Sequence, residues 1–146
     1  MEVFEFFFRS KLPVLFRHFK NHGVTPDVYY FEWTLTLFVR FVPLDICTRI
    51  WDSYLLLGEA YFVRAALGIL RLYGASLRAM EMEEIVRFLQ HLPAGMDGDG
   101  LFMAIEDICI TPGSFKRALR GIEGHRGAVR GASLSVRSGG QICVPS

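Results

Sequence analysis

The sequence holds few of the residues that mark several large protein classes. Its 146 residues include three cysteines, at positions 47, 109 and 143, an odd number at wide spacing. No disulfide framework fits such a set, and the pattern is typical of a reducing compartment. Cys47 lies between apolar neighbours, which favours a buried thiol over a nucleophile. The net charge is only +1, so no large field directs the chain toward nucleic acid or an anionic membrane.

Targeting and membrane-spanning signals are missing as well. The first five residues carry no basic group, and Glu5 interrupts their apolar run, which does not fit a secretory leader. The longest apolar candidate begins at Leu35 and is cut by Arg40. That length is well short of the roughly 18 residues that a membrane span requires. We therefore expect no transmembrane segment.

Motifs of catalysis and metal binding are also absent. The sequence contains no phosphate-binding Walker loop, no G-x-S-x-G elbow and no paired-cysteine metal motif. His18 and His22 have the spacing of a zinc-protease pair, but Phe19 stands where that motif requires glutamate, so both are predicted to be surface or interface histidines. The run Asp-Gly-Asp-Gly at 97–100 starts like a calcium loop but has Ile108 in place of its closing acid, so a plain turn between helices is expected. The sequence thus predicts no catalytic residue, no cofactor-binding residue and no metal site.

What the sequence does contain is apolar material at helical spacing. It is 51% hydrophobic and has thirteen phenylalanines, which is ample for a core. Apolar residues recur at helical spacing, no stretch keeps the alternation of a half-buried strand, and the connections are short. We predict an all-α array of short antiparallel helices. The expected helices cover residues 4–8, 12–19, 31–40, 43–57, 62–73, 83–92 and 101–110.

Proline and glycine supply the local start and stop signals of these helices. Pro13 breaks the first apolar stripe, Pro43 begins one helix, and Gly58 ends it. Segment 31–40 is apolar on nearly every side, which predicts burial on most sides. The residues expected in the core are Trp33, Phe38, Ile50, Trp51, Phe62, Leu67 and Phe88.

The composition changes near residue 121. From there to residue 146 glycine, serine and arginine dominate, apolar residues are few, and no period is visible. Such a segment buries too little surface to offset the chain entropy of ordering, roughly 1–2 kcal/mol per residue for the backbone. We predict two parts, a folded domain over 1–120 and a disordered tail over 121–146.

An ordered series of motifs resembles the C-terminal half of a TBC domain, the Rab GTPase-activating fold. The family has a tryptophan helix, a Leu-Pro-Leu turn, an Arg-Ile-Trp-Asp helix and a Gly-x-x-Phe-x-x-Arg-x-Ala-Leu helix, in this order. The matching segments here are 33–38, 42–44, 49–52 and 58–67. The resemblance spans roughly residues 4–119. Departures are small: Val42 stands where the family more often has leucine, and the lead-in to Gly58 is slightly altered.

The resemblance implies hydrolysis of GTP on a Rab protein through two catalytic fingers, an arginine in I-x-x-D-x-x-R and a glutamine in Y-x-Q. Neither motif occurs in this sequence. Three aspartates are each followed, three positions on, by a residue other than arginine: Asp27 by Tyr30, Asp45 by Thr48 and Asp52 by Leu55. The two glutamines, Gln90 and Gln141, have the wrong context. We therefore expect no catalysis by this chain alone. Three explanations are open: the chain is the second part of a larger protein, a truncated gene model, or a family member that has lost catalysis.

Three arginines could still be considered as fingers, namely Arg40, Arg49 and Arg64, each beside large apolar residues in a predicted helix. A finger must project from an exposed position into the nucleotide site of the GTPase. Arg49 is three residues before Asp52, so we expect a structural ion pair between them. None of the three is predicted to act as a finger.

Two classes of function stay open. In the first, the chain is the C-terminal part of a Rab GTPase activator in vesicle trafficking, with a Rab protein as partner and a cytoplasmic place at endomembranes. In the second, it is a non-catalytic helical module that binds a small GTPase or another protein. No nucleic-acid partner is expected, and exposed apolar faces favour self-association. The coding sequence upstream of Met1 discriminates between the two classes.

Overall fold

The structure of the protein is a computed structural model that describes residues 1–137. Within these residues it consists of nine α-helices and one 3-10 helix and has no strand, which confirms the predicted all-α class. The elements are α1 (Glu2–Lys11), α2 (Pro13–Asn21), η1 (Pro26–Val28), α3 (Tyr30–Leu35), α4 (Leu44–Leu57), α5 (Glu59–Leu72), α6 (Gly74–Arg78), α7 (Met82–Gln90), α8 (Gly98–Asp107) and α9 (Pro112–Arg137). In residues 1–137 no helix is both long enough and apolar enough to cross a membrane.

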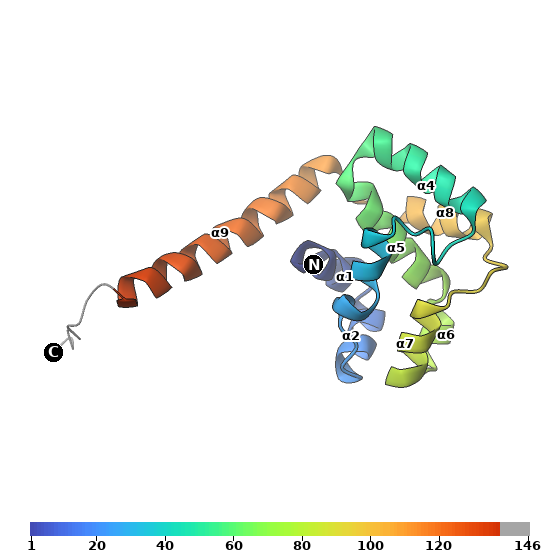
Figure 1. Ribbon diagram of the computed structural model, residues 1–146, viewed down its shortest axis with the longest axis horizontal. Coiled ribbons are helices and arrows are strands. Elements are labelled where there is room, and N and C mark those ends of the chain that lie inside the picture. Colours follow the sequence, from blue (N-terminus) through green and yellow to red (C-terminus); the bar gives the residue numbers. More distant parts are fainter. Residues whose placement is uncertain (138–146) are drawn as a thin grey trace.

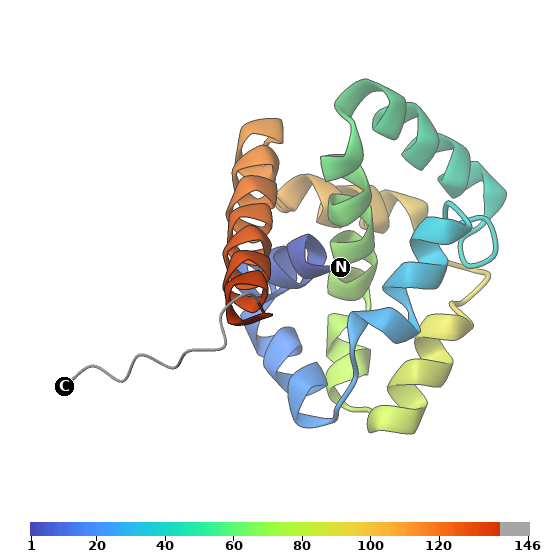
Figure 2. The same cartoon turned by 60° about the vertical axis from the view of Figure 1, so that its left-hand side comes forward.

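Helix α5 is the centre of the fold. Almost every residue from Ala60 to Leu70 is buried, as its all-round apolar sequence requires. Helices α1, α3, α4, α6 and α8 all contact it, and Figures 1 and 2 show them arranged around it. The closest approach is to α8, where Gly68 of α5 faces Ile105 without room for a side chain between them. This helix therefore fixes the relative positions of its neighbours.

Helix α4 follows its local signals closely. It starts directly after Pro43 and ends at Gly58, whose φ of 79° is readily adopted only by glycine. Its first half packs inward through Ile46, Cys47 and Ile50. The predictions for this helix, its start and its end are confirmed.

The predicted helix over 31–40 is confirmed in its first half only, because α3 ends at Leu35. The Thr36 hydroxyl donates to the carbonyl of Glu32, a local bond that competes with helix continuation. The chain then reverses through Leu37 and Phe38, both with left-handed φ values of 52° and 65°. The reversal turns Phe38 into the core, while Leu35 stays 71% exposed. The expected burial on most sides is therefore not found.

An aromatic cluster fills the space between the helices. Trp33 is fully buried and donates from Nε1 to the carbonyl of Leu89 at 3.2 Å, so its one polar atom is satisfied. Of the seven residues predicted to be in the core, five are buried, namely Trp33, Phe38, Ile50, Phe62 and Leu67. The other two, Trp51 and Phe88, are partly buried and pack against the core from outside.

Helix α9 runs well past the boundary expected at residue 120. It begins at Pro112 and extends to Arg137, so it includes part of the segment expected to be a disordered tail. Phe115 anchors it against Phe7 of α1, with ring centroids 6.4 Å apart, and the Nη2 of Arg126 donates to the Glu2 carboxylate at 2.9 Å. A helix anchored in this way continues through exposed glycines at a cost of about 1 kcal/mol each. Residues 138–146 lie outside the described residues, and the two-part division stays a prediction.

Candidate functional site

The three arginines considered as fingers occupy different environments. Arg64, on α5, donates from Nε to the carbonyl of Ile108 at 2.9 Å and from Nη2 to that of Ile105 at 3.1 Å. These carbonyls lie at the C-terminal end of α8, where backbone acceptors lack helical partners and a cation is favoured. The guanidinium of Arg64 therefore caps α8, and its hydrogen-bond donors are directed into this protein.

Arg49, on α4, is held by α8 rather than by its own helix. Its Cζ lies 3.9 Å from the centroid of the Phe102 ring, and Nη1 lies 3.8 Å from the Asp99 carboxylate. The predicted pair with Asp52 is thus wrong. Packing of α4 on α8 puts an aromatic face under the guanidinium, and this cation–π attraction is stronger than an ion pair along the exposed face of α4. Helix periodicity along α4 carries no signal for partners on α8, so sequence reasoning missed Asp99 and Phe102.

Arg40 has the most open position of the three. It lies in the turn between α3 and α4 rather than in a helix, and its side chain is exposed. Among residues 1–137 the structure records no hydrogen bond or ion pair from its guanidinium. No partner within the described residues fixes its orientation, whereas a finger depends on a preorganised charge.

His18 joins α2 to the segment after α6, whereas His22 bonds within its own helix. Nε2 of His18 lies 3.0 Å from the Met80 carbonyl, Nδ1 of His22 lies 2.9 Å from the His18 carbonyl, and the two rings are 4.2 Å apart. Both side chains are partly buried, in keeping with the predicted interface role. In the part of the chain that the structure describes, no group of three or more His, Cys, Asp or Glu could hold a metal ion.

The Asp-Gly-Asp-Gly run begins a helix instead of forming the expected turn. Asp97 is the N-cap residue of α8, and Gly98 is its first residue. A Cβ on Gly98 would lie 3.3 Å from Cγ1 of Ile46, so glycine lets α8 start close to α4. Cys47, in the same part of the fold, is fully buried as predicted, and burial raises the pKa of its thiol.

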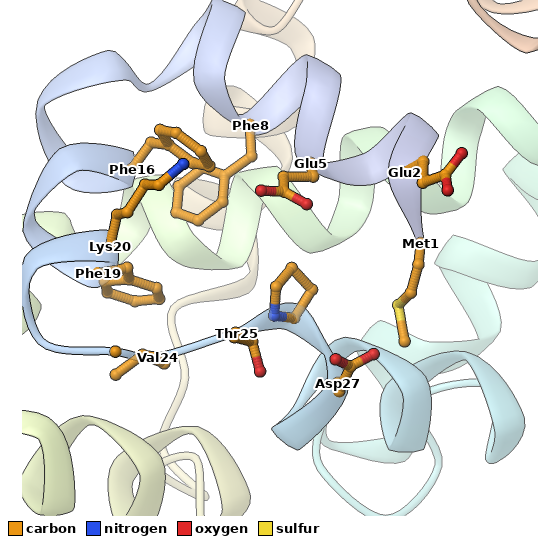
Figure 3. Close-up of a pocket in the computed structure, with 12 residues that line it drawn as sticks. Met1, Glu2, Glu5, Phe8, Phe16, Phe19, Lys20, Val24, Thr25 and Asp27 are labelled. Atoms are coloured by element: carbon orange, nitrogen blue, oxygen red, sulfur yellow. The ribbon is translucent and has the colours of Figure 1, made fainter. Parts of the chain in front are cut away.

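A cavity of about 220 Å³ opens between α1, α2 and the segment leading into η1. Its floor is aromatic, with Phe8, Phe16 and Phe19, while the Glu5 carboxylate and the Lys20 ammonium lie at its rim (Figure 3). The Lys20 nitrogen is 5.8 Å from the centroid of the Phe16 ring. No cysteine, serine or histidine lines this cavity, so it offers none of the common nucleophile and base pairs.

Comparison with known proteins connects this architecture to one family. The family model of the Rab-GTPase-TBC domain matches residues 1–77. TBC1 domain family member 14 of Homo sapiens is 42% identical over 106 residues, which cover 73% of this chain and 15% of that protein. TBC1 domain family member 12 of Mus musculus matches with the same identity and coverage. Drainin of Dictyostelium discoideum is 35% identical over 108 residues, or 73% of this chain and 25% of that protein. The chain thus spans a minor part of the length of these relatives.

Proposed function

We propose that this chain, which belongs to the Rab-GTPase-TBC domain family, forms the C-terminal part of a domain that activates GTP hydrolysis by a Rab-type small GTPase. The observation that carries the proposal is the family match over residues 1–77, which contain the predicted motif series on α3, α4 and α5. In this role the chain supplies a helical scaffold, and the partner is a Rab protein.

The chain alone, in our proposal, does not accelerate hydrolysis. An arginine finger contributes about 10³ to 10⁵ in rate, which is roughly 4–7 kcal/mol of barrier at ~1.36 kcal/mol per decade. The guanidinium of Arg64 is committed to two backbone carbonyls and that of Arg49 to an aromatic face. Arg64 is therefore turned toward this protein, Arg49 would have to leave the Phe102 ring to enter a partner's nucleotide site, and Arg40 lacks a fixed orientation. Catalysis would then depend on finger residues supplied from outside this segment.

A non-catalytic binding module is the second candidate, and the surface of α4 favours it. Leu55 and Leu56 are 79% and 85% exposed in its last turn. These leucines add exposed apolar surface at the end of α4, and contiguous apolar surface of sufficient area marks sites of protein contact. We expect this surface to support either self-association or docking of a partner. Wherever its partner is a Rab-type GTPase, we propose that the chain works in the cytoplasm, at endomembranes that the GTPase marks.

Single-turnover hydrolysis of GTP by a panel of Rab proteins tests the proposal. The full chain should leave the rates unchanged, whereas a longer protein that adds upstream coding sequence with both finger motifs should raise them into the finger range. Binding of a Rab protein without stimulation by either protein would favour the second candidate. Stimulation by the chain alone would contradict our assignment, and Arg40→Ala, Arg49→Ala and Arg64→Ala would then identify the arginine responsible.

A further inference from the structure

The chain is nearly neutral overall, but its charges are unevenly distributed along the sequence. Residues 6–26 contain Arg9, Lys11, Arg17 and Lys20 and no aspartate or glutamate. Residues 60–80 contain Arg64, Arg71 and Arg78 and again no carboxylate side chain. Two long segments therefore carry only positive formal charge, although the net charge of the chain is +1.

The fold brings these two segments together. Helix α2 contacts α6, and α6 contacts α5. The bond between His18 and the Met80 carbonyl joins α2 to the residues that follow α6, and α2 and α6 lie near each other in Figures 1 and 2. A cavity of about 410 Å³ opens where the start of α2 meets the end of α5 and α6. Cations line its edge, and we call it the basic groove.

The basic groove combines an apolar floor with a cationic rim. Leu12, Val14 and Ala75 contribute to the floor, and Val14 is 58% exposed. Lys11 comes from α1, Arg71 from α5 and Arg78 from α6, and no aspartate or glutamate lines the groove. Three helices thus present positive charge to one apolar surface.

The charges of the rim are largely uncompensated. Arg71 makes an ion pair with Asp107, with Nη2 3.1 Å from the carboxylate. Lys11 and Arg78 are exposed, and among residues 1–137 the structure records no ion pair for either of them. Two full positive charges therefore remain at the rim, where the adjacent protein surface excludes water from one side and strengthens their field.

We propose that the basic groove binds an acidic peptide segment of a partner protein, with one apolar side chain on the floor and carboxylates paired with Lys11 and Arg78. Charge complementarity selects the sign of the partner, and the apolar floor adds burial of a side chain to the ion pairs. The groove is open, and its volume of about 410 Å³ admits an apolar side chain of a peptide, whereas a flat membrane surface would stay at its rim. The proposal is independent of GTPase activation.

Fluorescence anisotropy with a labelled synthetic peptide tests the proposal on the full chain. The probe is a short peptide in which one leucine is flanked by aspartate and glutamate, and the control peptide has asparagine and glutamine in their place. We expect the acidic probe to bind and the neutral one not to bind. Raising the salt from about 0.1 M to about 1 M, where the Debye length falls from about 10 Å to about 3 Å, should abolish most of the binding.

Matched charge variants localise the binding. Lys11→Gln with Arg78→Gln should weaken the affinity roughly three- to thirtyfold, as expected for two exposed ion pairs. Arg87→Gln with Arg120→Gln removes the same net charge from exposed positions on α7 and α9 and should change it less than about twofold. Ala75→Glu, which adds a carboxylate at the groove, should also weaken binding. Circular dichroism confirms that each variant is folded.

Three results would overturn the proposal. The first is equal loss of affinity in the groove pair and the control pair, since that would mean binding by overall charge alone. The second is equal binding of the acidic and neutral peptides. The third comes from co-sedimentation with phosphatidylcholine vesicles that contain or lack phosphatidylserine. If the chain binds no peptide but is captured by the anionic vesicles, and the variant with Lys11→Gln and Arg78→Gln is not captured, the groove binds a membrane instead.

Discussion

Replacing Gly68 with alanine should destabilise the fold, although the same change usually strengthens a helix. Removing a glycine from a helix interior contributes about 1 kcal/mol in favour of the folded state. Here, however, a Cβ would collide with Cγ1 of Ile105 on α8 and would lie 3.3 Å from the Ile105 backbone nitrogen. Inserting a methyl group into such a packed contact costs about 1–3 kcal/mol. The net change should be a loss of up to about 2 kcal/mol, or a few degrees in Tm for a chain of this size.

Gly124→Ala is the matched control, because a Cβ at this position in α9 would meet nothing within 4 Å. It should raise the free energy of unfolding by up to about 1 kcal/mol. Thermal and urea unfolding of both variants, followed by circular dichroism, give the comparison. A Gly68→Ala protein as stable as Gly124→Ala would refute the close contact between α5 and α8.

A second substitution tests whether Ile105 is the cause. Ile105→Ala alone should cost about 2–5 kcal/mol, because it leaves a cavity under α5. It also removes Cγ1, the atom that blocks a Cβ on Gly68. Adding Gly68→Ala on that background should therefore be neutral or stabilising, with a coupling energy of at least about 1 kcal/mol between the two sites. If the stability changes of the two substitutions simply add, the strain caused by a Cβ at Gly68 comes from a contact other than Ile105.

Three further outcomes are expected from single sites. Arg64→Ala removes two charge-assisted hydrogen bonds from the end of α8 and should lower the free energy of unfolding by about 1–3 kcal/mol in urea titrations, whereas Arg40→Ala, at an exposed turn, should change it by less than about 0.5 kcal/mol. Burial, aided by a nearby carboxylate, raises the pKa of Tyr30 from 10.0 to about 12. The contribution of its neutral form to the free energy of unfolding should thus be complete below pH 10.0 and be lost as the pH rises toward about 12. If Tyr30→Phe leaves the dependence of stability on alkaline pH unchanged, this linkage is absent. Burial raises the pKa of the Cys47 thiol, so iodoacetamide should modify exposed Cys109 well before Cys47, as measured by peptide mapping. Equal labelling of the two in the folded protein would contradict the buried position of Cys47.

The sequence predicted the elements whose limits depend on local chemistry. Pro43 and Gly58 bound α4, because proline lacks a backbone donor and glycine accepts a left-handed φ whatever the rest of the fold does. The apolar run over 62–73 predicted most of α5, which starts slightly earlier, at Glu59, but its central position in the fold was not predicted. Segment 31–40 has the same apolar composition but was misread, because its reversal depends on the buried position of Phe38, a long-range contact that periodicity does not encode.

The surroundings of the charged side chains were much less predictable. Arg49 was expected to pair along its own helix, and its partners Asp99 and Phe102 come from α8, some fifty residues away in sequence. Arg64 caps a helix to which it does not belong. The two segments without aspartate or glutamate are visible in the sequence and indicate local positive charge. They form one basic surface only because α2 packs on α6 in the fold. Pairs within one helix follow from spacing, whereas pairs between helices need the fold.

The reversal at Leu37 and Phe38 has a consequence for the order of folding. Each non-glycine residue in the left-handed region costs about 1–2 kcal/mol, and the turn has no glycine to reduce that cost. Local backbone bonds close it, such as that from the Phe38 amide to the Trp33 carbonyl at 2.8 Å. Burial of Phe38 against Phe62 and the hydrogen bond from Trp51 Nε1 to the Leu37 carbonyl at 2.9 Å stabilise it from outside. Because of the cost of the left-handed residues, we expect the turn to be a poor nucleus for the packing of α3 on α4. We predict that it closes after α4 and α5 have assembled the site for Phe38, in which case weakening these contacts should accelerate unfolding and leave the folding rate nearly unchanged.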